Sequence, residues 1–182
     1  MPTQTVETSP ARKPLEIIRP DLAVAIPMTA LNGYVIPRGA IVGCTSSGKV
    51  RCHTAAVVTS GFTTGSATGV VDAPEAFKVG DDLFYDETNQ LIGTIQSIVG
   101  NTITLTANAA YNVPTGKVVA VKSGNGAPTA IGVADEGSDG VGDTVIRVLI
   151  GGYLNYQQTS GHSKKAWADL GAVYLENGIF KF

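Results

Sequence analysis

The sequence has little charge and no long apolar run. Charged residues make up 15% of its 182 residues, with 13 Lys and Arg against 15 Asp and Glu and a formal net charge of −2. An ordinary soluble domain carries roughly 25%. A chain of this kind has no basic surface for a polyanion, so we expect no nucleic-acid partner. Its apolar stretches, such as 118–121 and 145–150, are far shorter than the ~20 residues that span a bilayer, so we expect no membrane partner.

Cysteine and histidine are scarce as well. Cys44 and Cys52 are the two cysteines of the chain, too few to staple a scaffold of this size, which favours a reducing compartment. A disulfide between Cys44 and Cys52 remains an alternative if a hairpin sets them opposite each other. Together with His53 they supply three metal ligands without a fourth, a weak basis for a zinc site. We therefore predict no metal site and no cofactor.

Helical patterning is absent from the first part of the chain, because prolines recur between Pro2 and Pro27 and push each preceding residue toward extended geometry. This spacing predicts an extended, proline-rich N-terminal arm over 1–35. Segment 1–7 has no basic start followed by an apolar run, so we expect no cleaved secretory signal. The arm carries apolar side chains that a solvated tail has little reason to carry. These are Leu15, Ile17, Ile18, Leu22, Val24 and Ile26. The arm is expected to dock, either on its own domain or on a partner.

The rest of the chain is rich in short β-type runs and in glycine, of which the whole sequence has 22 residues. Segments 40–45 and 49–54 flank Ser46-Ser47-Gly48 and predict a hairpin. The stretch 59–69 is dense in Gly, Ser and Thr and predicts a loop or a domain crossover.

Segment 70–122 predicts an inserted, barrel-like β module, because its short strands follow one another with no helical pattern between them. The alternation is clearest at 102–107, where Ile103, Leu105 and Ala107 share one face and threonines the other.

Segments 36–69 and 123–182 are expected to form a β-rich core around that module. Two strands flank a polar loop at 135–143. Near the C-terminus Ser163 is expected to cap a short helix that ends near Gly171 and carries Trp167 as a core anchor. A final strand over 179–182 follows the turn at Asn177-Gly178. The predicted fold class is mainly β with one short C-terminal helix.

Catalytic and nucleotide-binding patterns do not hold. Segment 43–50 fits G-x-x-x-x-G-K but places Val50 where a P-loop needs Ser or Thr, and it continues as a strand rather than a helix. His53 and His162 are the only histidines, and no G-x-S-x-G elbow is present. Acidic pairs such as Asp135-Glu136 lie beside turn residues and are expected to be solvated, without the pattern of a calcium loop. We predict no catalytic residues and no enzyme.

Three segments in this order resemble the lambda-type head decoration proteins of tailed bacteriophages, which are trimeric cement proteins of the capsid exterior. They are 36–43 with the turn at 47–49, 130–134 with 145–155, and the helix near Trp167 followed by 177–180. Together they cover about half of the chain. Segment 70–122 departs from the compact family pattern, which leaves the outer surface and any function of the module open.

The resemblance implies a non-enzymatic protein that forms a homotrimer, binds the major capsid protein and stabilises the shell. It places the protein on the virion exterior after synthesis in the host cytoplasm. The arm residues Leu15 to Ile26 would then add extended backbone to an exposed capsid strand. Two other hypotheses stay open. One is a tail or baseplate β protein. The other is a carbohydrate-binding or host-adhesion module with Phe84, Tyr85 or Tyr111 as a stacking platform.

Overall fold

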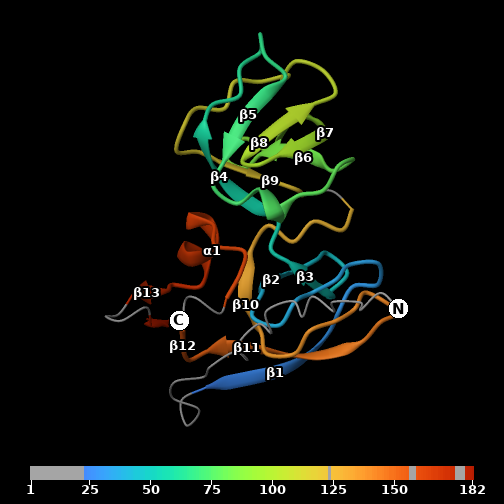
Figure 1. The fold of residues 1–182 in the computed structure, drawn as a ribbon, viewed down its shortest axis with the longest axis vertical. Coiled ribbons are helices and arrows are strands. Elements are labelled where there is room, and N and C mark those ends of the chain that lie inside the picture. Colours follow the sequence, from blue (N-terminus) through green and yellow to red (C-terminus); the bar gives the residue numbers. More distant parts are fainter. Residues whose placement is uncertain (1–22, 123, 156–158, 175–178) are drawn as a thin grey trace, which may run out of the picture.

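The computed structural model describes residues 23–122, 124–155, 159–174 and 179–182. Within this part the protein is mainly β, with one short α-helix near the C-terminus, which confirms the predicted fold class. The chain forms two lobes stacked along its longest axis, a closed barrel and a second lobe that we call the body (Figure 1). None of the described helices has the length and apolar character needed to cross a membrane.

The body is built on a five-stranded sheet in which neighbouring strands are antiparallel. In spatial order its strands are β1 (Val24–Thr29), β11 (Val145–Gly151), β10 (Ala130–Ala134), β2 (Ile41–Cys44) and β3 (Val50–Cys52). The sheet curls, because Ala30, just after the first strand, bridges to Val50 on the last. Its inner face packs Ile36, Val42 and Val148 into one buried cluster.

The β2–β3 hairpin confirms the turn prediction. Cys44 pairs with Val50, and the Thr45 amide donates to the Lys49 carbonyl at 2.8 Å. Gly48 has φ +78, the left-handed conformation that glycine adopts without steric cost.

The C-terminal part of the body is a small sheet with one helix. The sheet has the order β12 (Tyr153–Asn155), β14 (Ile179–Lys181) and β13 (Val173–Tyr174). Helix α1 (Lys164–Asp169) begins after Ser163, whose Oγ accepts a hydrogen bond from the Ala166 amide at 2.9 Å, so the predicted cap is confirmed. Trp167 is half-buried against the cluster of Leu149 and Leu154. The final strand is present, whereas the Asn177-Gly178 turn lies outside the described residues.

The upper lobe is a closed, six-stranded antiparallel barrel with a filled interior (Figure 1). In order around the barrel the strands are β4 (Ala55–Ser60), β5 (Thr68–Val71), β8 (Thr102–Leu105), β7 (Gln90–Val99), β6 (Asp82–Tyr85) and β9 (Val118–Ala120). A 3-10 turn, η2 (Pro74–Ala76), follows β5. Ile103 and Leu105 point inward as expected, while Ala107 lies beyond the end of β8 and is exposed.

The barrel begins earlier than the predicted module at 70–122. Its first strand, β4, lies in segment 36–69, which was expected to belong to the core. β4 pairs with β5 on one side and with β9 on the other, so it is the strand that closes the barrel. The stretch 59–69 is therefore a connection inside the barrel and not a crossover between lobes. Phe62, at its centre, is buried and bridges to Val113.

The described end of the predicted arm belongs to the body. β1 lies within the predicted range 1–35 and pairs along its length with β11, Ile26 opposite Val148 and Met28 opposite Ile146. These apolar pairs face the core. The strand also contains a proline, which has no amide hydrogen to donate and is therefore tolerated at the edge of a sheet. Leu15, Ile17, Ile18 and Leu22 lie outside the described residues.

Candidate functional site

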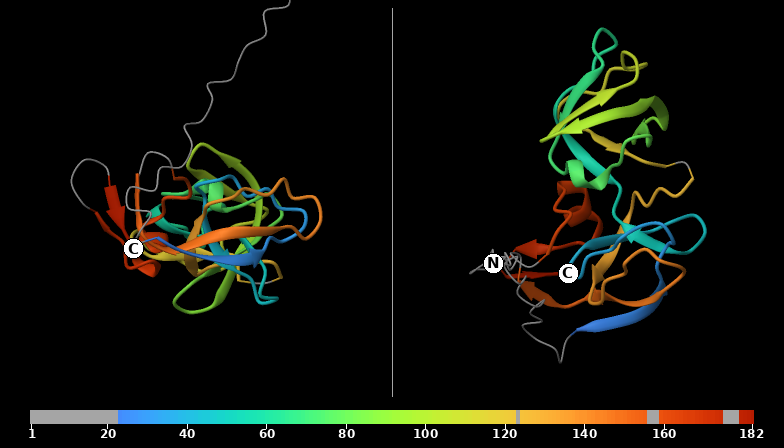
Figure 2. Two further views of the ribbon diagram at one scale, coloured as in Figure 1. Left: turned by 90° about the horizontal axis from the view of Figure 1, so that it is seen from below. Right: turned by 45° about the vertical axis from the view of Figure 1, so that its right-hand side comes forward.

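The edge strand β1 is the described continuation of the predicted capsid-binding arm. It lies at the end of the molecule opposite the barrel, as the blue strand in both figures shows (Figures 1 and 2). One edge of β1 pairs with β11, and within the described part of the chain no strand pairs with its other edge over 24–28. A free strand edge presents backbone donors and acceptors to which another extended chain can add.

The predicted binding residues on this strand differ in exposure. Val24 is 53% exposed, whereas Ile26 is partly buried against its own sheet. Pro27 is exposed and lies opposite Arg147 on β11. Proline has no amide hydrogen, so it interrupts the hydrogen-bonding pattern of the strand. The structure thus leaves Val24, and not Ile26, available to a partner at this edge.

Beside β1, a buried carboxylate holds two arginines in place. Asp135 is 3% exposed and accepts hydrogen bonds from Arg38 Nη2 at 3.1 Å and Arg147 Nη2 at 2.5 Å. The prediction of a solvated Asp135 is wrong, because this residue directly follows buried Ala134 at the end of β10 and is carried into the body with it. Glu136, also at that turn, is exposed and pairs with Arg147 Nε at 3.3 Å.

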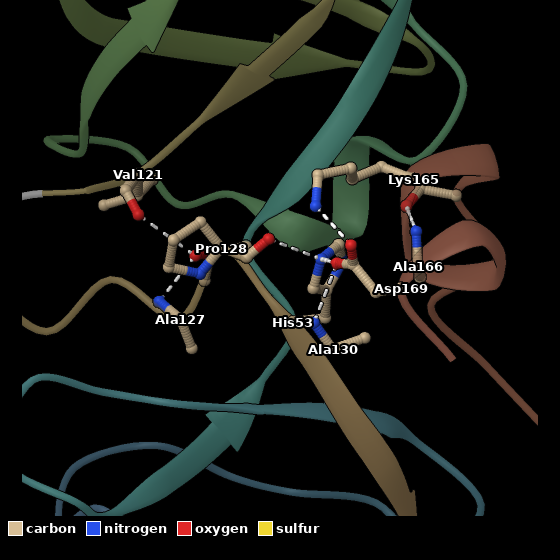
Figure 3. A network of polar contacts seen from close by, with 10 residues as sticks. His53, Val121, Ala127, Pro128, Ala130, Lys165, Ala166 and Asp169 are labelled. Atoms are coloured by element: carbon tan, nitrogen blue, oxygen red, sulfur yellow. Dashed lines mark hydrogen bonds and ion pairs between the residues drawn. The ribbon is translucent and has the colours of Figure 1, made fainter. Parts of the chain in front are cut away.

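A second polar network lies where the body meets the barrel (Figure 3). His53, which follows β3, is buried, and its Nε2 lies 3.0 Å from the Pro128 carbonyl oxygen and 3.6 Å from Asp169 Oδ2. Asp169 ends helix α1, where it accepts from the Ala130 amide at 3.0 Å and from Lys165 Nζ at 2.5 Å. The network therefore joins three segments that are distant in sequence.

Asp169 has a strongly altered acidity. Its partial burial acts to raise the pKa, but hydrogen bonds from His53, Lys165 and the Ala130 amide, together with the positive charge of Lys165, outweigh it and lower the pKa from 3.8 to about 2. Asp169 is consequently ionised at any ordinary pH. A group of this kind stabilises a fold and does not transfer protons near neutrality.

The network has no activated nucleophile among the residues that the structure describes. The Thr54 hydroxyl accepts from the Ala127 amide at 2.7 Å and lies 3.3 Å from the Val121 carbonyl oxygen, which it donates to. The Ser163 hydroxyl caps helix α1. Since a His–Asp pair needs a free hydroxyl or thiol beside the imidazole for covalent catalysis, this arrangement supports a structural role.

The other sequence candidates are dispersed. The P-loop-like segment is the β2–β3 turn, and Lys49 pairs with Asp143 at 2.6 Å. Cys52 is paired with Val42 and Cys44 with Val50, so the two thiols are offset along the hairpin and both are free.

The three aromatic residues of the carbohydrate-binding hypothesis differ in burial. Tyr85 belongs to the barrel core, and its neighbour Phe84 is only partly buried, as alternation along β6 requires. Tyr111 is 42% exposed and lies on a separate loop. Tyr111 is therefore the most exposed of the three side chains.

Comparison of the chain with protein-family models, curated proteins and solved structures gives no match. The fold defines a class, a mainly β protein made of a curled sheet and a closed barrel. The resemblance to head decoration proteins rests on the sequence motifs alone.

Proposed function

We propose that the protein is a non-enzymatic capsid decoration protein, a homotrimer that binds the major capsid protein on the outside of a bacteriophage head and stabilises the shell. The observation that carries the proposal is the position of β1. The strand that continues the apolar, proline-rich N-terminal segment lies with a free edge at one end of the molecule, and the barrel lies at the other (Figure 2).

This arrangement suits a protein that attaches to a surface by one end. Extended backbone that adds to an exposed strand gains main-chain hydrogen bonds, and alternate side chains supply specificity. Three copies of a weak contact in one trimer give strong overall binding through effective concentration. The barrel would then project outward, since it is attached at the opposite end of the body.

The binding test must spare the edge strand. Deleting 1–30 would remove β1 together with buried Ala30 and so damage the body. The sharper variant is the triple substitution Leu15→Ser, Ile17→Ser and Ile18→Ser, with Val79→Ser, on the exposed barrel surface, as the matched control. Co-sedimentation with expanded empty heads built from the cognate major capsid protein measures binding.

The proposal expects binding by the wild type and the control, and at least a tenfold weaker association of the triple variant. Equal binding of all three would remove the arm from the proposal. Sedimentation equilibrium should give a mass of three times the 18.8 kDa chain. Labelling of tails and not of the head lattice in electron micrographs would assign the protein to the tail instead.

A further inference from the structure

Two cations from different lobes share one aromatic ring at the junction. Arg51 Cζ on β3 lies 4.1 Å from the centroid of the Tyr34 ring, and Lys78 Nζ lies 4.0 Å from the same centroid. Tyr34 and Arg51 belong to the body, while Lys78 follows η2 in the barrel. Both distances are well within the roughly 6 Å over which a cation is attracted to a ring face.

Arg51 is an unusual body residue because its charge is buried. It is 3% exposed, its Nη1 donates to the Asn125 carbonyl at 3.0 Å, and its Nε has no hydrogen-bond partner among the described residues. Asn125 lies on the segment that returns from the barrel to the body. The Tyr34 ring thus provides the aromatic face against which this desolvated guanidinium is held.

We infer that Lys78, Tyr34 and Arg51 form an interlobe latch that holds the barrel in one orientation on the body. Two connections join the lobes covalently, the passage from His53 to Ala55 and the return from Val121 to Ala130. Within these connections the Thr54 amide donates to the Ala127 carbonyl and the Val121 amide to the Thr54 carbonyl, both at 3.0 Å. The contact between Lys78 of the barrel and the Tyr34 ring of the body adds a side-chain restraint to these connections.

A second contact braces the helix against the barrel. Asp72, at the end of β5, accepts from the Lys164 amide of α1 at 3.0 Å through Oδ2 and from the Val57 amide at 2.7 Å through Oδ1. The latch and this carboxylate restrain the barrel at two places besides its connections. The inference concerns the arrangement of the lobes and does not depend on what the protein binds.

Hydrogen exchange tests the latch. In Lys78→Met the aliphatic stem is kept and the charge is removed. Opening of the latch should then speed exchange of the junction amides of Thr54 and Val121 about tenfold. Amides in the two cores, such as those of Ile103 in the barrel and Val148 in the body, should exchange at the wild-type rate, which separates local opening from global unfolding.

Three further variants make the result decisive. Lys78→Arg keeps the cation and should restore slow exchange at the junction. Tyr34→Leu should speed exchange as Lys78→Met does. Lys117→Met, which removes the exposed Lys117–Glu87 ion pair on the barrel surface, should leave exchange at the junction unchanged. Wild-type exchange at Thr54 and Val121 in Lys78→Met would overturn the latch, as would equally fast exchange in Lys78→Arg.

Discussion

His53 and Asp169 come within 3.6 Å of each other at the junction, although one follows β3 and the other ends α1. The same carboxylate accepts from the Ala130 amide at the start of β10. Helix α1 is thereby fixed to the body at its C-terminal end, while its first amide, that of Lys164, donates to Asp72 of the barrel. A six-residue helix is too short to be stable alone, so these tertiary contacts determine its position.

The low pKa of Asp169 predicts a loss of stability in acid. Its pKa is 3.8 as an unperturbed group and about 2 in the fold. The stabilisation is therefore complete above about pH 5 and is lost as the pH falls through 3.8 towards 2 and below. The shift corresponds to about 2 kcal/mol. Urea unfolding of the wild type and Asp169→Asn from pH 6 to pH 2 measures this contribution. The difference in free energy of unfolding between the two proteins should shrink by this amount over the lower part of the pH range.

The matched control is Asp143→Asn. Asp143 pairs with Lys49 at 2.6 Å, but its side chain is 47% exposed, and exposed ion pairs contribute roughly 1 kcal/mol or less. A stability difference between wild type and Asp169→Asn that stays constant from pH 6 to pH 2 would contradict the assignment to Asp169.

Because the carboxylate of Asp135 is buried, we expect the loss of its two arginines to lower the free energy of unfolding more than the loss of the carboxylate itself. Removing both in Arg38→Met with Arg147→Met leaves an unpaired charge that is 3% exposed, at a cost of about 3 to 5 kcal/mol. Asp135→Asn leaves two arginines that already reach water, with 46% and 59% of their side chains exposed, and should cost about 2 kcal/mol or less.

Chemical denaturation of these variants gives the ranking. Combining all three substitutions should recover stability relative to the double arginine variant, because the orphaned charge is then gone. A double arginine variant that is more stable than Asp135→Asn would show that Asp135 does not need its partners.

Ser163 predicts a smaller effect that is confined to the helix. Its Oγ is the cap acceptor for the Ala166 amide, and the residue is fully buried. Ser163→Ala should lower the free energy of unfolding by about 1 to 2 kcal/mol, and Ser163→Thr should retain most of it. Equal stability of all three proteins in thermal unfolding would remove the cap as a contributor.

The features that the sequence predicts correctly are those with local causes. Ser47-Gly48 specifies a turn between two β-type runs, Ser163 caps the residues directly after it, and 102–105 shows the two-residue period of a half-buried strand. Each signal is complete within a few residues, so no knowledge of the rest of the chain is needed.

The missed features depend on partners far away in the chain. β4 closes the barrel only because it meets β9, and Asp135, carried into the body at the end of β10, finds its partners in Arg38 and Arg147. The latch requires Tyr34 and Lys78 to approach across two lobes. No periodicity or turn signal encodes such pairings.

Gly69 predicts the sharpest packing effect in the barrel. It lies on β5 beneath the buried Phe62 ring, and a Cβ there would come within 2.6 Å of three ring carbons. Because the ring is buried in the barrel core and must move to admit the methyl group, Gly69→Ala should destabilise the protein by about 1 to 3 kcal/mol. A Cβ added at Gly65, in the same connection, would meet no atom within 4 Å, so Gly65→Ala should be neutral or stabilising by up to about 1 kcal/mol.

Adding Phe62→Leu to Gly69→Ala should cost less than the sum of the two single changes, because the clashing ring carbons are removed. Denaturant unfolding measures the wild type and the four variants, and strict additivity of the changes at Phe62 and Gly69 would show that the ring does not set the requirement for glycine.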